Sequence, residues 1–248
     1  MKIGILGVGN IGKTLALTLA KTGHEVSVAN SRGPEMIDRE VLATGAKAVT
    51  VEQAVFENDV IILSIPLHRI PEIAPLFADI PLEKVVIDTS NYYPNRDNKI
   101  ESIESGQVES LWIQEQLGHP IAKAWNAIGS DSFAKKGKPI GSPNRIAIPI
   151  AADREADRKV TISLVNDTGF DAIYTGSLND SWRQQPGSPV YCTDLTLNEI
   201  EAVIDTAERE RLPKRRDLAL AAIIERVGDG KTKLDSDYGV RLNRVLYM

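Results

Sequence analysis

Six residues near the N-terminus restrict the possible folds of this chain more than any other feature. They read Gly-Val-Gly-Asn-Ile-Gly over positions 7–12, directly after an apolar run at residues 3–6. Ile11, Leu15 and Leu19 then recur at the spacing of one helix face, up to Gly23. The pattern predicts a strand, a glycine turn and a helix, with the free N–H groups of the helix N-terminus facing an anion.

The three glycines have separate roles in such a turn. Gly7 permits the tight turn, Gly9 lets a pyrophosphate approach the backbone, and Gly12 lets the helix pack against the strand. A glycine turn alone can have purely steric causes, but here a second apolar strand follows at residues 25–30. The unit therefore predicts a dinucleotide site whose contacts are Gly7, Val8, Gly9, Asn10, Ile11 and Gly12.

The end of the second strand indicates which dinucleotide binds. Asn30-Ser31-Arg32 stands where NAD-binding proteins carry an acidic residue for the ribose hydroxyls. A hydroxyl and a guanidinium can instead bind a 2′-phosphate, the guanidinium by charge-assisted hydrogen bonds. We therefore expect NADP(H), with Asn30, Ser31 and Arg32 at its adenosine end; the alternative is that Arg32 is a solvated loop cation.

Apolar runs alternate with helical patterns along the next hundred residues. Strands are expected at residues 46–49, 59–65, 84–87 and 121–126, and helices at 34–43, 51–57 and 69–78. The alternation predicts an α/β fold, a Rossmann-type doubly wound parallel sheet of strand order 3-2-1-4-5-6.

Further elements follow the sixth strand. Strands are expected at 146–150 and 170–174, and helices at 153–167, 199–211 and 214–227. We expect a dinucleotide-binding domain over residues 1–128 and a smaller α/β and helical extension over 129–248. The extension either packs on the first domain or continues it.

Ligands of doubly wound sheets lie at the carboxyl ends of the strands. Ser64, Ile65 and Pro66 follow the fourth strand, and the last two offer an apolar wall to a nicotinamide ring. Asn91 and Asn126 follow the fifth and sixth strands and are either ligands of the ribose or carboxamide, or turn formers. His68 is a weak candidate for a proton donor and otherwise a capping or packing residue.

Composition narrows the classes of partner. The chain has 29 Lys and Arg against 34 Asp and Glu, a net charge of -5, so we expect no nucleic-acid partner and no attraction to anionic membranes. One cysteine and three histidines predict neither a disulfide nor a metal site, and Cys192 is interpreted as a packed small residue. Without a signal-type segment or a spanning apolar run, the chain is expected to be cytoplasmic.

The motifs together resemble a known family. Gly-Val-Gly-Asn-Ile-Gly, Asn30-Ser31-Arg32, Asp-Thr-Ser-Asn at 88–91 and Lys-Ala-Trp-Asn at 123–126 resemble the deazaflavin-dependent NADP oxidoreductases and the related NADPH-binding domain of the six-transmembrane metalloreductases. The resemblance covers roughly residues 1–178. It implies NADPH at the glycine loop, contacts at Ala124 and Asn126, and hydride transfer to a deazaflavin or FMN as a small-molecule electron acceptor.

Two alternative functions stay open at this point. One is an NADPH-dependent reductase of a small carbonyl or imine substrate, which would need a positioned proton donor. The other is a non-catalytic NADPH-sensing protein. Residues 179–248 lie outside the resemblance, and their segment 182–187 is a candidate to reshape the acceptor pocket.

The C-terminal region is more apolar than a free terminus requires. Residues 218–224 and 240–248 need cover, either from the chain itself or from a second copy. Because members of the resembled family are often dimeric, we expect a homodimer.

Overall fold

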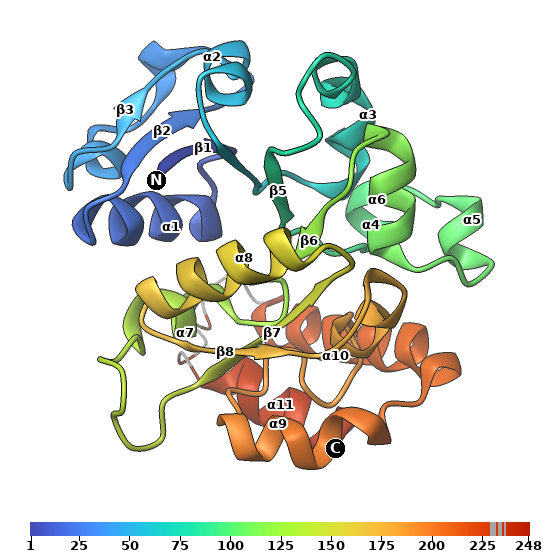
Figure 1. The fold of residues 1–248 in the computed structure, drawn as a ribbon. Helices are drawn as coiled ribbons and strands as arrows, with labels where there is room; N and C mark the ends of the chain where they lie inside the picture. The colour runs from blue at the N-terminus through green and yellow to red at the C-terminus, as the bar shows by residue number, and fades with distance from the viewer. Residues whose placement is uncertain (229–231, 233–234, 236) are drawn as a thin grey trace.

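The fold is organised around one eight-stranded sheet (Figure 1). The computed structural model describes residues 1–228, 232, 235 and 237–248. The strand order is β3-β2-β1-β4-β5-β6-β7-β8, and the first six strands follow the predicted order. The strands are β1 (Lys2–Leu6), β2 (Glu25–Ala29), β3 (Lys47–Ala48), β4 (Val60–Leu63), β5 (Val85–Asp88), β6 (Ala122–Lys123), β7 (Ala147–Ala152) and β8 (Asp171–Tyr174).

Helices cover both faces of this sheet. In chain order they are α1 (Asn10–Lys21), α2 (Val51–Phe56), α3 (Ile70–Ile73), α4 (Pro94–Asp97), α5 (Glu101–Glu104), α6 (Glu109–Leu117), α7 (Ser130–Lys135), α8 (Glu155–Asp167), α9 (Leu197–Val203), α10 (Leu212–Val227) and α11 (Tyr238–Tyr247). Short 3-10 helices, including the one at Leu178–Gln184, join several of them.

Strand β4 shows why the central strands are apolar without interruption. Val60 and Ile62 pack in the core that contains residues of α1 and α8, whereas Ile61 and Leu63 pack in the core that contains residues of α2 and α6. All four side chains are buried. Successive side chains of a strand point to opposite faces, so a strand covered by helices on both sides has no polar face.

The chain continues the sheet beyond β6, and the direction of pairing changes there. β5 and β6 are parallel, β6 and β7 are antiparallel, and β7 and β8 are parallel again. The pairing of β6 with β7 crosses residue 128, where the sequence divides into two expected domains. That division stays a prediction.

Several predicted elements are shorter in the structure. The helix expected at 34–43 is two 3-10 helices, Pro34–Met36 and Arg39–Leu42, because Ile37 between them is extended. The helix expected at 69–78 is broken into short turns by prolines, and the helix expected at 199–211 is α9 followed by two 3-10 turns. The strand expected at 121–126 keeps only Ala122–Lys123, because Trp125 takes a left-handed φ of 56°.

The C-terminal helices pack on the second half of the sheet. In Figure 1, α9, α10 and α11 gather on the side of β7 and β8. Ile200 of α9 joins a small core with Ala147 of β7, and Tyr247 of α11 joins another with Ala219 of α10. The chain therefore covers part of its own apolar tail. Within the described ranges, every helix is too short or too polar to cross a membrane.

Candidate functional site

The glycine loop lines a large cleft. This glycine-loop cleft has a volume of about 670 Å³ and lies past the carboxyl ends of β1, β2 and β4. Of the predicted ligands it contains Gly7, Val8, Gly9, Asn30, Ser31, Arg32, Ser64, Ile65 and Pro66. The sequence did not single out Arg69 and Glu72, which also line it and form an ion pair of 2.5 Å.

The local geometry separates the roles of the three glycines. A Cβ on Gly12 would lie 2.0 Å from the carbonyl oxygen of Gly7, and Gly7 itself has a φ of 103°. A Cβ on Gly9 would meet no atom within 4 Å. Gly7 and Gly12 are therefore required by the fold, whereas the space beside Gly9 is open to a ligand.

Helix α1 begins with Gly9 as its N-cap residue. In the part of the chain that the structure describes, no side chain caps the helix N-terminus. The first N–H groups of a helix need partners, and an anion such as a pyrophosphate satisfies them. The helix end and the open space beside Gly9 fit the same group.

The turn after β2 leaves two donors without protein partners. Asn30 Oδ1 accepts from the backbone N–H of Arg32 at 2.8 Å, which fixes the turn, but its Nδ2 is buried and unpartnered within the part of the chain that the structure describes. The Arg32 side chain is exposed on the cleft, and no described residue forms an ion pair with it. Both groups fit a dinucleotide carrying a 2′-phosphate, the amide as hydrogen-bond donor and the guanidinium as counter-charge.

Other predicted ligands lie elsewhere. Asn10, Ile11, Gly12, His68, Asn91, Ala124 and Asn126 do not line the glycine-loop cleft. His68 Nδ1 is 2.8 Å from Asp97 Oδ1, and this carboxylate is buried. Hydrogen bonds from Arg96 and His68 hold the pKa of Asp97 below its usual value, although burial acts against them.

Asn91 and Asn126 bind each other rather than facing free space. Asn126 Nδ2 donates to Asn91 Oδ1 at 3.1 Å, and Asn91 Nδ2 donates to the Asn126 carbonyl at 2.9 Å. Gln184 Nε2 donates to Asn126 Oδ1 at 2.8 Å. Gln184 belongs to the segment 182–187, which is a candidate from the sequence to reshape the acceptor pocket. Its hydrogen bond holds this segment against Asn126, which follows β6. A role of either asparagine in ligand binding stays a prediction.

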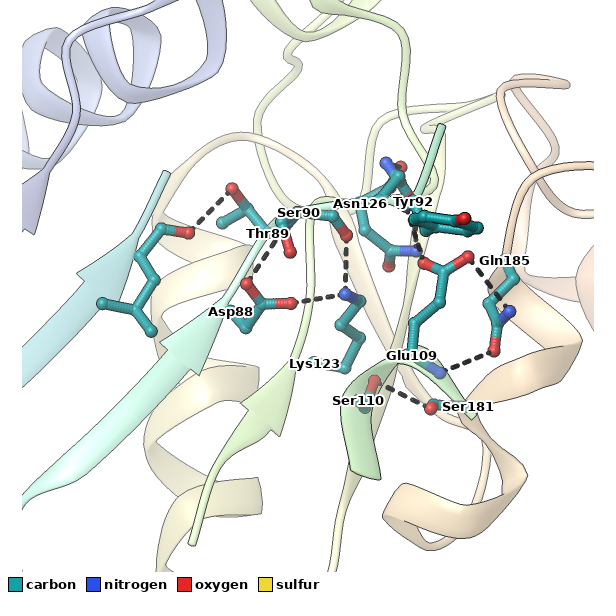
Figure 2. A network of polar contacts seen from close by, with 12 residues as sticks. Asp88, Thr89, Ser90, Tyr92, Glu109, Ser110, Lys123, Asn126, Ser181 and Gln185 are labelled. Carbon is teal, nitrogen blue, oxygen red and sulfur yellow. Dashed lines mark hydrogen bonds and ion pairs between the residues drawn. The ribbon is translucent and has the colours of Figure 1, made fainter. Parts of the chain in front are cut away.

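Lys123 explains the first residue of the Lys-Ala-Trp-Asn motif (Figure 2). Its side chain is fully buried, pairs with Asp88 at the end of β5, and donates to the Ser90 carbonyl at 2.6 Å. The ion pair thus joins the short strands β5 and β6 where they end. A lysine inside the apolar run of residues 121–125 was the available signal, but the sequence analysis did not use it.

A second buried carboxyl lies close to this pair. Glu109, the first residue of α6, accepts from the backbone N–H of Tyr92 at 3.1 Å and from Gln185 Nε2 at 3.1 Å (Figure 2). Burial raises the pKa of Glu109 to about 7, although the nearby Lys123 acts in the opposite direction. This carboxyl can hold or release a proton near neutral pH.

A second pocket lies past the ends of β5 and β6. It has a volume of about 340 Å³ and its lining includes Tyr93, Tyr191, Arg216 and Tyr247; we call it the tyrosine pocket. The hydroxyl oxygens of Tyr93 and Tyr191 are 3.0 Å apart. Burial raises the pKa of both phenols, so they stay protonated and can donate hydrogen bonds.

Cys192 also lines this pocket. Burial raises the pKa of its thiol to about 12, which keeps the thiolate form scarce. Its packing against Tyr191 and Ala127 agrees with the interpretation as a small packed residue.

Comparisons with known proteins support the prediction that this protein binds NADP(H). A family model described as "NADP oxidoreductase coenzyme F420-dependent" matches residues 2–92. Protein YjhV of Escherichia coli K12 is 54% identical over 101 residues, which are 39% of this chain and 70% of YjhV. The residues that the family model matches contain the glycine loop and Asn30-Ser31-Arg32.

Two solved structures share most of the fold. The hypothetical protein SMa0349 from Sinorhizobium meliloti is 25% identical with a TM-score of 0.69, covering 79% of this chain and 96% of its own. A protein from Arthrobacter sp. FB24, named a putative F420-dependent NADP-reductase, is 18% identical with a TM-score of 0.57, covering 73% and 87%. The chain belongs to the NADP oxidoreductase coenzyme F420-dependent family and is an NADP-dependent oxidoreductase.

Proposed function

We propose that this protein transfers a hydride between NADP(H) and a flavin or deazaflavin ring. The observation that carries the proposal is the glycine-loop cleft, where the start of α1, the Asn30 amide and the Arg32 guanidinium meet, each without a side-chain partner among the described residues. The description of the family names coenzyme F420, which is a deazaflavin.

In this reaction, the residues of the protein bind and orient the coenzyme. The backbone of the glycine loop and the start of α1 bind the pyrophosphate, while Ser31 and Arg32 bind the 2′-phosphate. Ile65 and Pro66 offer an apolar surface to the nicotinamide. When bound, NADPH supplies the hydride, and the reduction is completed by one proton taken up by the acceptor. Transfer between two stacked rings depends on proximity more than on an acid or base.

The test is a screen of NADPH oxidation with one acceptor at a time. We expect oxidation with a deazaflavin or with FMN, and no comparable rate with ferric chelates or with a panel of ketones and imines. Rates with NADH in place of NADPH measure the coenzyme preference. Absence of oxidation with every ring acceptor would reject the proposal.

A second candidate function has its own observation. The hydrogen-bonded hydroxyls of Tyr93 and Tyr191 line a pocket, remain protonated, and supply the proton donor that a carbonyl or imine reductase needs. The Tyr93→Phe substitution separates the two functions. Loss of the donor should lower kcat on a carbonyl or imine by about 10²–10⁴-fold. Hydride transfer to a ring acceptor needs no such donor, so its kcat should change little and the variant should act at most on the KM for the acceptor.

A further inference from the structure

Arg216 is a buried cation that lines the tyrosine pocket. It lies in α10, is 6% exposed, and its guanidinium carbon is 5.4 Å from the centre of the Tyr92 ring. Its Nε donates to Asp217 Oδ1 at 2.8 Å, and no other described residue accepts a hydrogen bond from it. A guanidinium has five N–H donors, so its terminal nitrogens can donate to a further partner. An anionic ligand that reaches Arg216 can accept charge-assisted hydrogen bonds from them.

Arg216 lines two spaces that differ in charge. On one side is a cavity of about 120 Å³, which also holds the carboxyl groups of Glu104 and Glu109. On the other side is the tyrosine pocket, about 340 Å³, a size within the range of small-molecule sites. Among the described lining residues of the tyrosine pocket, Arg216 is the one cation.

The two carboxylates of the tyrosine pocket repel an anion only weakly. The side chains of Asp131 and Asp235 are 57% and 62% exposed, and they pair with Lys135 and Arg241. Asp217, the ion-pair partner of Arg216, is likewise 60% exposed. Charges exposed to water are screened, whereas the Arg216 guanidinium, whose side chain is 7% exposed, is screened much less. An anion therefore meets a net attraction beside Arg216 in the tyrosine pocket.

We propose that the tyrosine pocket binds the electron acceptor by an anionic group, a carboxylate or a phosphate, held by the Arg216 guanidinium. The Tyr93 and Tyr191 hydroxyls hydrogen-bond the remainder of the same molecule. This assignment rests on the proposed hydride transfer and narrows its acceptor to anionic molecules. Arg216 lies outside the region that the family model matches, so the selectivity would come from the C-terminal extension.

The test compares matched charged and neutral probes on the full-length protein with NADP⁺ present. FMN against riboflavin tests a phosphate, and 2-oxobutyrate against 2-butanone tests a carboxylate. Binding is measured by flavin fluorescence for the first pair and by saturation-transfer NMR for the second. We expect at least one charged probe to bind about tenfold more tightly than its neutral partner, and the pair that responds identifies the anionic group.

The variants assign the preference to one side chain. Arg216→Gln should weaken binding of the charged probe by about tenfold to a hundredfold and leave the neutral probe unchanged. Arg216→Lys should keep part of the preference because it keeps the charge. Arg226→Gln is the control, since it removes the same charge from an exposed position of the same helix.

Three results would overturn the proposal: equal affinity for charged and neutral probes, no binding of either charged probe at millimolar concentration, or an unchanged preference in Arg216→Gln. If that variant does not fold, the wild-type comparison and Arg216→Lys decide. Because these measurements need no turnover, they separate the two proposals. Arg216-dependent anion binding without NADPH oxidation would support the anion site and reject the hydride transfer. Oxidation at equal rates with charged and neutral acceptors would support the hydride transfer and reject the anion site.

Discussion

At the scale of single residues, we expect Arg32 to carry the coenzyme preference. Its guanidinium is exposed on the glycine-loop cleft and is not engaged by any described acidic residue. Arg32→Ala should weaken NADPH binding by about 1.5–3 kcal/mol, the range for hydrogen bonds to a charged group, and leave NADH binding nearly unchanged. Titration of both coenzymes measures this. Arg39→Ala is the control, because Arg39 is exposed nearby but does not line the cleft. Equal losses for NADPH and NADH would assign Arg32 a structural role.

Gly9 and Gly12 form a matched pair for the glycine loop. Gly9→Val adds a side chain in open space, so the protein should fold normally and lose coenzyme binding. Gly12→Val places a Cβ 2.0 Å from the Gly7 carbonyl oxygen, so it should unfold the protein or lower its stability strongly. Circular dichroism, thermal unfolding and NADPH titration together test both variants. Normal NADPH binding by folded Gly9→Val would show that the loop is not the phosphate site.

At the scale of elements, a buried ion pair joins β5 and β6. Lys123→Met leaves the Asp88 carboxylate buried without its counter-charge, and the free energy of unfolding should fall by about 3–5 kcal/mol. The double variant Lys123→Met with Asp88→Asn should recover most of this loss, because it removes the uncompensated charge as well. Denaturant unfolding of the wild type, Lys123→Met and the double variant measures these free energies. Lys135→Met removes the cation of an exposed pair and should change stability by less than about 0.5 kcal/mol.

The start of α6 should make stability depend on pH through Glu109. In the folded protein its pKa is raised from the ordinary 4.5 to about 7, so between these values the folded state binds more protons than the unfolded state. Stability must then fall as pH rises from 4.5 to 7, by about 3 kcal/mol from this group. Glu109→Gln should remove this contribution, so the stability difference between wild type and variant should change across that interval. Glu115→Gln on the exposed side of α6 is the control. A difference that stays constant with pH would contradict the raised pKa.

For the whole molecule, the apolar surface of the last two helices predicts self-association. Part of this region is covered internally, since Asn243 and Tyr247 are buried, but Leu218, Ile224 and Val245 are 48%, 53% and 82% exposed. We expect a homodimer that uses this surface. Light scattering at micromolar concentrations should give twice the chain mass, and Ile224→Lys with Val245→Lys should give a monomer of unchanged circular dichroism. A wild-type monomer, or a dimer unaffected by the two lysines, would contradict this.

The order of the first six strands could be read from the sequence because it depends on local patterns. A strand such as β4 is a continuous apolar run, and the glycine loop allows few backbone paths. Element ends were harder to predict, because they depend on contacts that no local pattern contains. Trp125 ends β6 by taking a left-handed φ, and its indole donates to Thr168 in a distant part of the chain.

The sequence by itself predicted the coenzyme half of this protein, because its expected ligands lie in three short segments, 7–12, 30–32 and 64–66, each directly after a predicted strand. Only the tertiary structure brought together the residues of the proposed acceptor site. Tyr93 and Tyr191 are 98 positions apart, and Arg216 lies in a helix beyond both, yet they line one pocket. The burial that raises the pKa of Glu109, and the burial of the Arg216 guanidinium, likewise arise only when the C-terminal extension packs against the sheet.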